Sequence, residues 1–177
     1  MARYSSLKKF ISAANEVLLK GHVALIFVED DIEVGTTLRH HIDCGFKHVV
    51  VFMPDAFELP KDLSDRVHRV NYDMSADAAL EKAVNAVIKA VPDIWLYYCY
   101  NAEYLFYPFC ETRTVGEMIA FNVEERRSTI MTYVVDLYAN DLEKFPNAVS
   151  LDHAHMDRSG YYALARMKPG TEWPEER

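Results

Sequence analysis

The sequence has no long apolar run and no cluster of basic residues. A stretch of about 18 apolar residues, the usual signal for a membrane-spanning helix, does not occur. Basic residues gather only in pairs such as Lys8-Lys9 and Arg126-Arg127, and 27 acids against 19 Lys and Arg leave a formal net charge of −8. This balance argues against nucleic-acid binding, and we expect no membrane span.

Cysteine is also scarce. The three residues, Cys44, Cys99 and Cys110, are odd in number and form no C-x-x-C pair. They indicate reduced thiols rather than a disulfide framework. The first ten residues lack the continuous apolar core of a signal peptide, so we expect a cytoplasmic protein.

Several catalytic motifs are missing. The six glycines form no G-x-G-x-x-G and no P-loop, and no G-x-S-x-G occurs. Acyl transfer through a nucleophilic serine and P-loop phosphate chemistry therefore have no support.

Strands and helices alternate over the first hundred residues. Apolar runs predict strands at 22–28, 48–53, 67–71 and 94–100. Apolar residues at helical spacing, over 7–18, 34–42 and 80–88, predict helices before and between them. This order predicts an α/β fold of three layers, α/β/α, with a mostly parallel central sheet and right-handed crossovers.

The second half of the chain has a weaker pattern. Thr114 and Glu117 form a capping box before a helix, and Thr129–Tyr138 is a β-branched apolar run that predicts a strand. We expect a single α/β domain over 1–177, with an irregular C-terminal segment at 141–177.

Three acids, Glu29, Asp30 and Asp31, follow the first predicted strand after the opening helix. Open parallel sheets bind ligands at the carboxyl ends of their strands, so these acids are candidates to contact a nucleotide or hold a cation. A competing interpretation is that Asp30 or Asp31 caps the helix that follows.

Asn101 and Glu103 lie at the carboxyl end of the predicted strand 94–100, between aromatic residues. Their position makes them a second candidate site by the same argument. The competing interpretation for Glu103 is an edge carboxylate that binds a neighbouring backbone N–H.

A third candidate is the loop that carries Asp152, His153, His155 and Asp157. Imidazoles and carboxylates at alternating positions can face one metal ion. Histidines in polar loops are mostly solvated, which is the competing interpretation. The metal-ligand candidates are thus Glu103, His153 and His155.

The segment V-A-L-I-F-V-E-D-D-I-E-V-G-T-T-L-R-H-H-I-D-C-G-F-K-H-V-V-V-F resembles the opening of family 2-like glycosyltransferases with the GT-A fold. In that family a strand ends in Asn-Glu, and a helix carrying a His is followed by Gly and a second strand. Glu29-Asp30, His40 and Gly45 match these places. Later, Trp95 and Glu103-Tyr104-Leu105 resemble the family's Trp-led strand and its Asp-x-Asp-Glu-Phe-Leu signature.

The resemblance covers about residues 22 to 140 and implies sugar transfer from a nucleotide-sugar donor to an unknown acceptor, with Mn²⁺ or Mg²⁺ as cofactor. It implies that Glu29 and Asp30 contact the nucleoside and that Asp73 contacts the base or ribose. It places Asn101 and Glu103 at the diphosphate-sugar region, with Glu103 as the catalytic residue. Since the family's acceptor-binding half does not fit into this length, we expect a fragment or a reduced relative.

The chain departs from the family signature at the metal site. Tyr100 and Ala102 stand where the family has two metal-binding aspartates, and Met53 replaces a frequent Asp. These departures leave a second interpretation open, a non-catalytic binding or assembly module on the same scaffold, with a protein partner.

A third interpretation comes from F-V-E-D-D-I-E-V-G-T-T-L, which also looks like the start of a response-regulator receiver, with Asp73 near the place of the phosphorylated residue. A receiver needs a Lys after its fifth strand. The sequence has no Lys between Lys89 and Lys144, which argues against phosphorelay activity.

Overall fold

The computed structural model describes residues 2–19 and 21–156 of the chain. By its internal contacts the chain divides into two compact units, Met1–Ser128 and Thr129–Arg177. None of the helices in the described residues is both long and apolar enough to cross a membrane.

The first unit is built on a five-stranded sheet in which every neighbouring pair is parallel. The strand order is β1-β4-β3-β2-β5, with β1 at Arg3–Tyr4, β2 at Val23–Phe27, β3 at His48–Met53, β4 at His68–Asn71 and β5 at Leu96–Tyr100. The helices are α1 at Leu7–Val17, α2 at Val34–Asp43, α3 at Ala79–Ala90 and α4 at Val115–Glu124. The predicted α/β fold with a parallel central sheet is confirmed.

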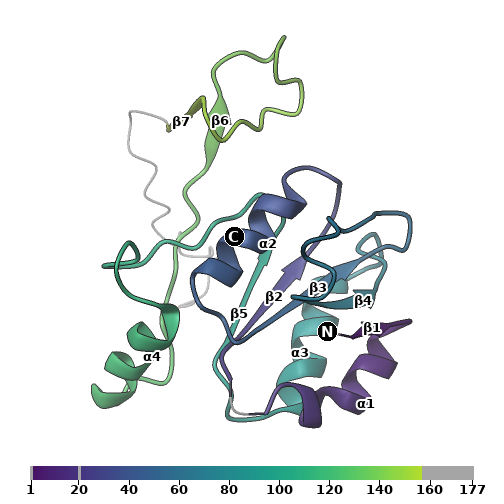
Figure 1. The fold of residues 1–177 in the computed structure, drawn as a ribbon, viewed down its shortest axis with the longest axis vertical. Coiled ribbons are helices and arrows are strands. Elements are labelled where there is room, and N and C mark those ends of the chain that lie inside the picture. Colours follow the sequence, from purple (N-terminus) through teal and green to yellow (C-terminus); the bar gives the residue numbers. More distant parts are fainter. Residues whose placement is uncertain (1, 20, 157–177) are drawn as a thin grey trace, which may run out of the picture. The chain divides into compact units, whose positions relative to one another are not determined.

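Helices cover both faces of the sheet, which gives the three predicted layers (Figure 1). Because side chains alternate along a strand, β2 supplies both cores. Val23, Leu25 and Phe27 pack in the core under α1 and α3, whereas Ala24 and Ile26 pack in the core under α2. All five residues are fully buried, which explains the uninterrupted apolar run in the sequence.

The helix starts confirm the predicted capping box and correct another prediction. Ser6 caps α1 by accepting a hydrogen bond from the Lys9 backbone N–H, and the capping box of α4 is present. The prediction that Asp30 or Asp31 caps α2 is wrong, because the helix starts later and its N-cap residue is Glu33. The Asp30 carboxylate accepts from the Ile32 N–H at 2.9 Å, so it closes a turn before the helix.

The predicted strand Thr129–Tyr138 is mostly wrong. Only Leu137–Ala139 forms a strand, β6, which pairs antiparallel with β7 at Ala154–Met156. Residues 129–136 have β propensity but no ladder among the described residues, and a strand is stabilised by its partner more than by its own composition. The segment predicted to be irregular thus contains β7.

Two histidines lie side by side at the amino ends of β3 and β4. The rings of His48 and His68 are 5.9 Å apart, and both nitrogens of His48 and Nδ1 of His68 are buried without a hydrogen-bond partner among the described residues. Burial lowers the pKa of His68 to about 4, with a further contribution from His48, whose own pKa is also lowered by burial. Both rings are therefore neutral at pH 7.

We predict that acid destabilises this unit through His68. In the unfolded chain this histidine has the ordinary pKa of about 6.5. Between pH 6.5 and 4, unfolding therefore takes up a proton, and the free energy of unfolding decreases as the pH is lowered. The loss from His68 between pH 7 and pH 5 should be about 2 kcal/mol.

Urea unfolding of the wild type and of His68→Gln at several pH values tests this. Below pH 6.5, the free energy of unfolding of the variant should depend less steeply on pH than that of the wild type, by the uptake of roughly one proton. Between pH 7 and 9 the two pH dependences should be the same. Equal slopes in both ranges would show that His68 does not cause the acid sensitivity.

Candidate functional site

The candidate site lies where the strand order reverses. From β2 the chain moves through α2 to β3 on one side, and after α3 it returns to β5 on the other side of β2. Two loops that leave the carboxyl ends of β2 and β5 therefore diverge from neighbouring strands. In open α/β sheets the crevice at such a switch point is the usual ligand site.

Asn101 joins the two loops. Its Oδ1 accepts from the Glu29 backbone N–H at 3.0 Å, and its Nδ2 donates to Asp30 Oδ1 at 2.6 Å and to the Ile32 carbonyl at 2.9 Å. The structure thus brings together the predicted site residues Glu29, Asp30 and Asn101. Since both Nδ2 hydrogens are engaged within the protein, Asn101 positions the loop of β2 and leaves ligand contacts to its neighbours.

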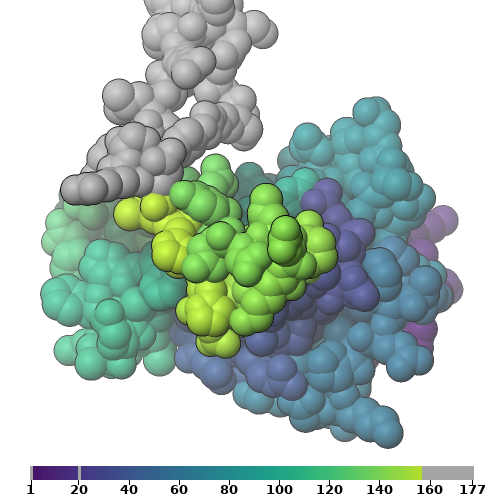
Figure 2. Space-filling view, turned by 90° about the horizontal axis from the view of Figure 1, so that it is seen from above, coloured from purple at the N-terminus to yellow at the C-terminus, as the bar shows by residue number. Residues whose placement is uncertain are grey.

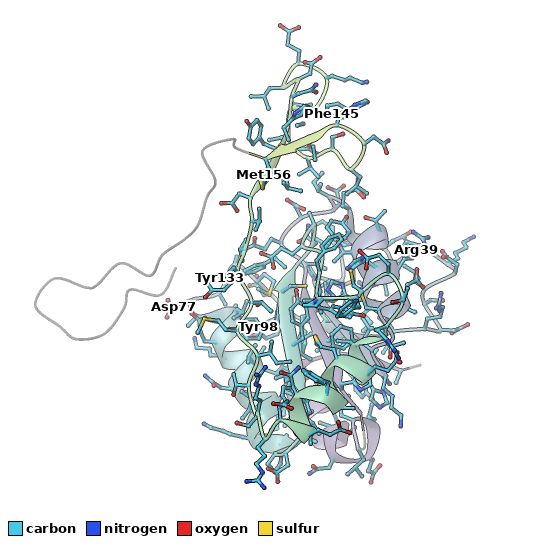
Figure 3. The ribbon with its side chains drawn as sticks, turned by 90° about the vertical axis from the view of Figure 1, so that its left-hand side faces the viewer. Arg39, Asp77, Tyr98, Tyr133, Phe145 and Met156 are labelled. Carbon is cyan, nitrogen blue, oxygen red and sulfur yellow. The ribbon has the colours of Figure 1, made fainter. Side chains whose placement is uncertain are left out.

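Glu103 folds back onto the end of β5. One carboxylate oxygen, Oε2, accepts from the Tyr100 backbone N–H at 2.8 Å. Among the described residues β5 is an edge strand, with Tyr98 exposed on it (Figure 3), so no neighbouring strand there binds this N–H. The competing interpretation, an edge carboxylate on a backbone N–H, is confirmed, and it fixes the half-buried Glu103 at the crevice.

Thr37 fastens both loops to α2. Its fully buried hydroxyl accepts from the Ala102 N–H at 2.9 Å and donates to the Glu33 carbonyl at 2.7 Å. Glu33 and Ala102 both have left-handed backbones, with φ of 52° and 59°, which is uncommon outside glycine. Sequence reasoning missed Thr37, because a threonine inside a helix carries no signal for a contact 65 residues away.

The paired histidines of α2 have structural contacts. His41 is buried, and its Nδ1–H donates to the Thr37 carbonyl at 2.8 Å. Burial lowers its pKa to about 4, so it is neutral at pH 7. The His40 Nε2–H donates to the Leu105 carbonyl at 2.8 Å, which holds the segment after Glu103 against α2.

Asp73 is not brought to this crevice. It follows β4, which lies two positions from β2 and three from β5 in the sheet. Its Oδ1 accepts from the Ser75 hydroxyl at 2.7 Å and from the Ser75 N–H at 2.9 Å, and these bonds lower the pKa of Asp73. The structure therefore gives Asp73 a local role in the turn before α3.

The metal-loop candidates lie in the second unit. His155 is exposed on β7, and the His153 ring lies 6.1 Å from that of Phe145, labelled in Figure 3. Asp157 lies outside the described residues. Among residues 2–19 and 21–156, no three His, Cys, Asp or Glu side chains are grouped to hold a metal ion by themselves.

A pocket of about 340 Å³ opens beside the crevice, between the loop after β2, the start of α2 and the loop after β3. The β3 loop forms part of the molecular surface seen in Figure 2. Ligand pockets span about 300 to 1,000 Å³, so this one suits a small ring system. Its lining consists of Asp31, Val34, Gly35, Met53, Ala56, Phe57, Glu58 and Pro60.

We predict that the hydroxyl of Thr37 is needed to hold the two loops. Thr37→Val keeps the volume but leaves the Ala102 N–H unpaired, and we expect a loss of about 1–3 kcal/mol in the free energy of unfolding. Thr37→Ser keeps the hydroxyl and should lose less. Urea unfolding at pH 7 measures both, and equal losses in the two variants would show that the hydrogen bonds contribute nothing.

Comparison with models of known protein families, with curated proteins and with solved structures finds no match to this chain. The function is therefore argued from the geometry of the crevice and its pocket.

Proposed function

We propose that this protein binds a nucleotide-sugar donor at the carboxyl edge of its sheet and transfers the sugar to an acceptor. The observation that supports this most is the meeting of the Glu29-Asp30 loop with the Asn101-Glu103 loop at the switch point, next to a pocket of about 340 Å³. A nucleoside in the pocket and a diphosphate-sugar at the crevice would use both parts.

The carboxylates suit the hydroxyl groups of a nucleoside. Glu29 and Asp30 are exposed at the crevice. Asp30 Oδ1 already accepts from the Ile32 N–H and from Asn101, which leaves Oδ2 as its oxygen for a ligand. Ionised carboxylates only accept hydrogen bonds, so they recognise donors such as ribose hydroxyls.

The crevice needs a counter-charge for a diphosphate. The loop residues 29–33 and 101–104 contain acids but no Lys or Arg, so a diphosphate alone is repelled. Mg²⁺ is commonly held by one or two carboxylates together with substrate phosphates, and Glu103 is the carboxylate that would hold Mn²⁺ or Mg²⁺ here. When bound, such an ion neutralises the departing nucleoside diphosphate.

Transfer breaks the bond between the anomeric carbon and the phosphate oxygen, and forms a bond from that carbon to the oxygen of an acceptor hydroxyl. The hydroxyl proton leaves with the released nucleotide. We assign Glu103 to the sugar or the metal side of this step, because Oε2 is held by the Tyr100 N–H beside the Asn101 loop. The charge of Glu103, more than its ability to take a proton, is what the site would use.

One observation favours a second candidate, a binding module without turnover. In the glycosyltransferase resemblance, Tyr100 and Ala102 stand where two metal-binding aspartates are expected, and here the Ala102 N–H is bound to the Thr37 hydroxyl. A protein of this kind would bind a nucleotide or its sugar conjugate and hydrolyse or transfer nothing.

We predict that a UDP-, GDP- or CMP-sugar stabilises the protein only in the presence of Mn²⁺ or Mg²⁺. A ligand at 100 times its Kd adds about 2.7 kcal/mol, which should raise the unfolding midpoint by about 5 to 10 °C. Thermal unfolding with each donor, with and without the metal, measures the shift. Release of the nucleotide (UDP, GDP or CMP) separates the transferase from the binding module.

Glu103→Gln is the test of the assigned residue. The amide oxygen still accepts from the Tyr100 N–H, so the fold should persist while the metal-dependent shift and any turnover are lost. Glu16→Gln, an equal change at an exposed site on α1, is the matched control. A wild-type response in Glu103→Gln would remove Glu103 from the site.

A further inference from the structure

The pocket beside the crevice has apolar walls and acidic groups. The partly exposed Phe57 and Pro60 supply its apolar surface from the loop after β3. Val34 of α2 and Met53 at the end of β3 are buried and present almost no surface to a ligand. Such walls fit a flat heteroaromatic ring, because ring faces lose little by leaving water and gain contact with apolar side chains.

Gly35 lets α2 pack closely against the β3 loop at one wall of this pocket. A Cβ at this position would lie 3.1 Å from Pro60 Cγ and 3.2 Å from Arg39 Nη1, which is tighter than ordinary contact. A larger side chain at position 35 would have to displace these groups or fill the space. The absence of a side chain at Gly35 thus permits the close approach of α2 and the β3 loop.

Side chains of β1 and β4 hold the loop after β3 in place. The largely buried Arg69 donates through Nη2 to the Phe57 carbonyl at 2.7 Å and to the Pro54 carbonyl at 3.0 Å. Asp55 accepts from Arg3 at 2.7 Å and from Asn71 at 2.8 Å. Four hydrogen bonds, donated by three residues of strands β1 and β4, therefore hold the loop, so the pocket is preformed rather than assembled by a ligand.

Among the described residues, the charged groups that line the pocket are both acids, Asp31 and Glu58. The nearby Arg39 guanidinium, close to Gly35, is paired with Asp62. Ionised carboxylates accept hydrogen bonds and donate none, and two parallel N–H donors satisfy a carboxylate best. The ligand edge that fits here has two adjacent N–H donors and no acceptor between them.

We propose that the pocket reads the Watson–Crick edge of guanine, so that the donor is a guanosine diphosphate sugar. Guanine presents its N1–H and its exocyclic amino group side by side. Uracil presents one N–H between two carbonyls, which carboxylates repel, and adenine and cytosine each present one amino group next to an acceptor nitrogen. Glu58 is the residue that accepts the two guanine donors.

This assignment rests on the proposed function and deepens it. Asp31 lies in the loop that also carries Glu29 and Asp30, so a base in the pocket places its ribose beside these two carboxylates. The phosphates then point along the crevice toward Glu103. The loop after β2 would thus contact the base through Asp31 and the ribose through Glu29 and Asp30.

Titration of the full chain with GDP, IDP, UDP, CDP and ADP in the presence of Mn²⁺ tests the assignment by calorimetry. We expect GDP to bind at least about tenfold more tightly than UDP, CDP and ADP, because a site built to accept hydrogen bonds rejects bases that leave it unpaired. IDP lacks the exocyclic amino group and should bind about tenfold more weakly than GDP.

Two variants locate the base. Glu58→Gln should weaken the binding of GDP about tenfold and abolish the preference for GDP over IDP. Ala56→Trp, at an exposed lining residue, should prevent every nucleotide from entering the pocket. Glu16→Gln is the control and should bind as the wild type does. Unchanged binding in both pocket variants would place the base elsewhere and overturn the inference.

The two proposals fail differently. UDP, CDP or ADP binding as tightly as GDP would overturn the guanine assignment and leave nucleotide-sugar transfer standing. Absence of binding by all five nucleotides, with and without Mn²⁺, would contradict the proposed function and the guanine assignment together.

Discussion

The architecture of the first unit depends on the complete burial of β2. Its five residues are fully buried, it pairs with β3 over its whole length on one edge and with β5 on the other, and it supplies both cores. A strand in this place has no choice of register, because a shift by one residue would exchange the two faces. The loops that follow β2 and β5 therefore start from fixed neighbouring points, which is why residues 72 positions apart in sequence meet at one crevice.

Polar side chains then hold these loops in strained conformations. Glu33 and Ala102 have left-handed backbones, a costly state for residues with a side chain, and the hydroxyl of Thr37 binds both. Asn101 adds three bonds between the same loops. Much of the hydrogen-bonding capacity at the crevice is used internally, so the exposed carboxylate oxygens are what a ligand would meet. This explains why we propose a cation beside the phosphates and carboxylates around the nucleoside.

Sequence reasoning succeeded where the local pattern and the fold agree. The strand His48–Met53 was predicted with its exact bounds, and the capping box of α4 was identified from Thr114 and Glu117. It failed where a contact with a residue distant in the sequence determines the local structure. Asp30 is placed in the sequence like a helix cap, but its carboxylate accepts hydrogen bonds from Asn101 and from the Ile32 N–H instead. Thr129–Tyr138 has strand composition, yet only the part that meets β7 forms a strand.

The amino-acid sequence by itself determined the α/β class, the buried strands and the clustering of acids and amides at strand ends, because periodicity and burial are local properties of a chain. Only the tertiary structure decided the strand order, and with it which strand ends are neighbours. Asp73 and Glu103 both follow strands, but the sheet order separates β4 from β5 and leaves Asp73 with Ser75. Contacts such as that of Thr37 with Ala102, and a pocket formed by two loops around α2, exist only after the crossovers close, since no spacing in the sequence encodes them.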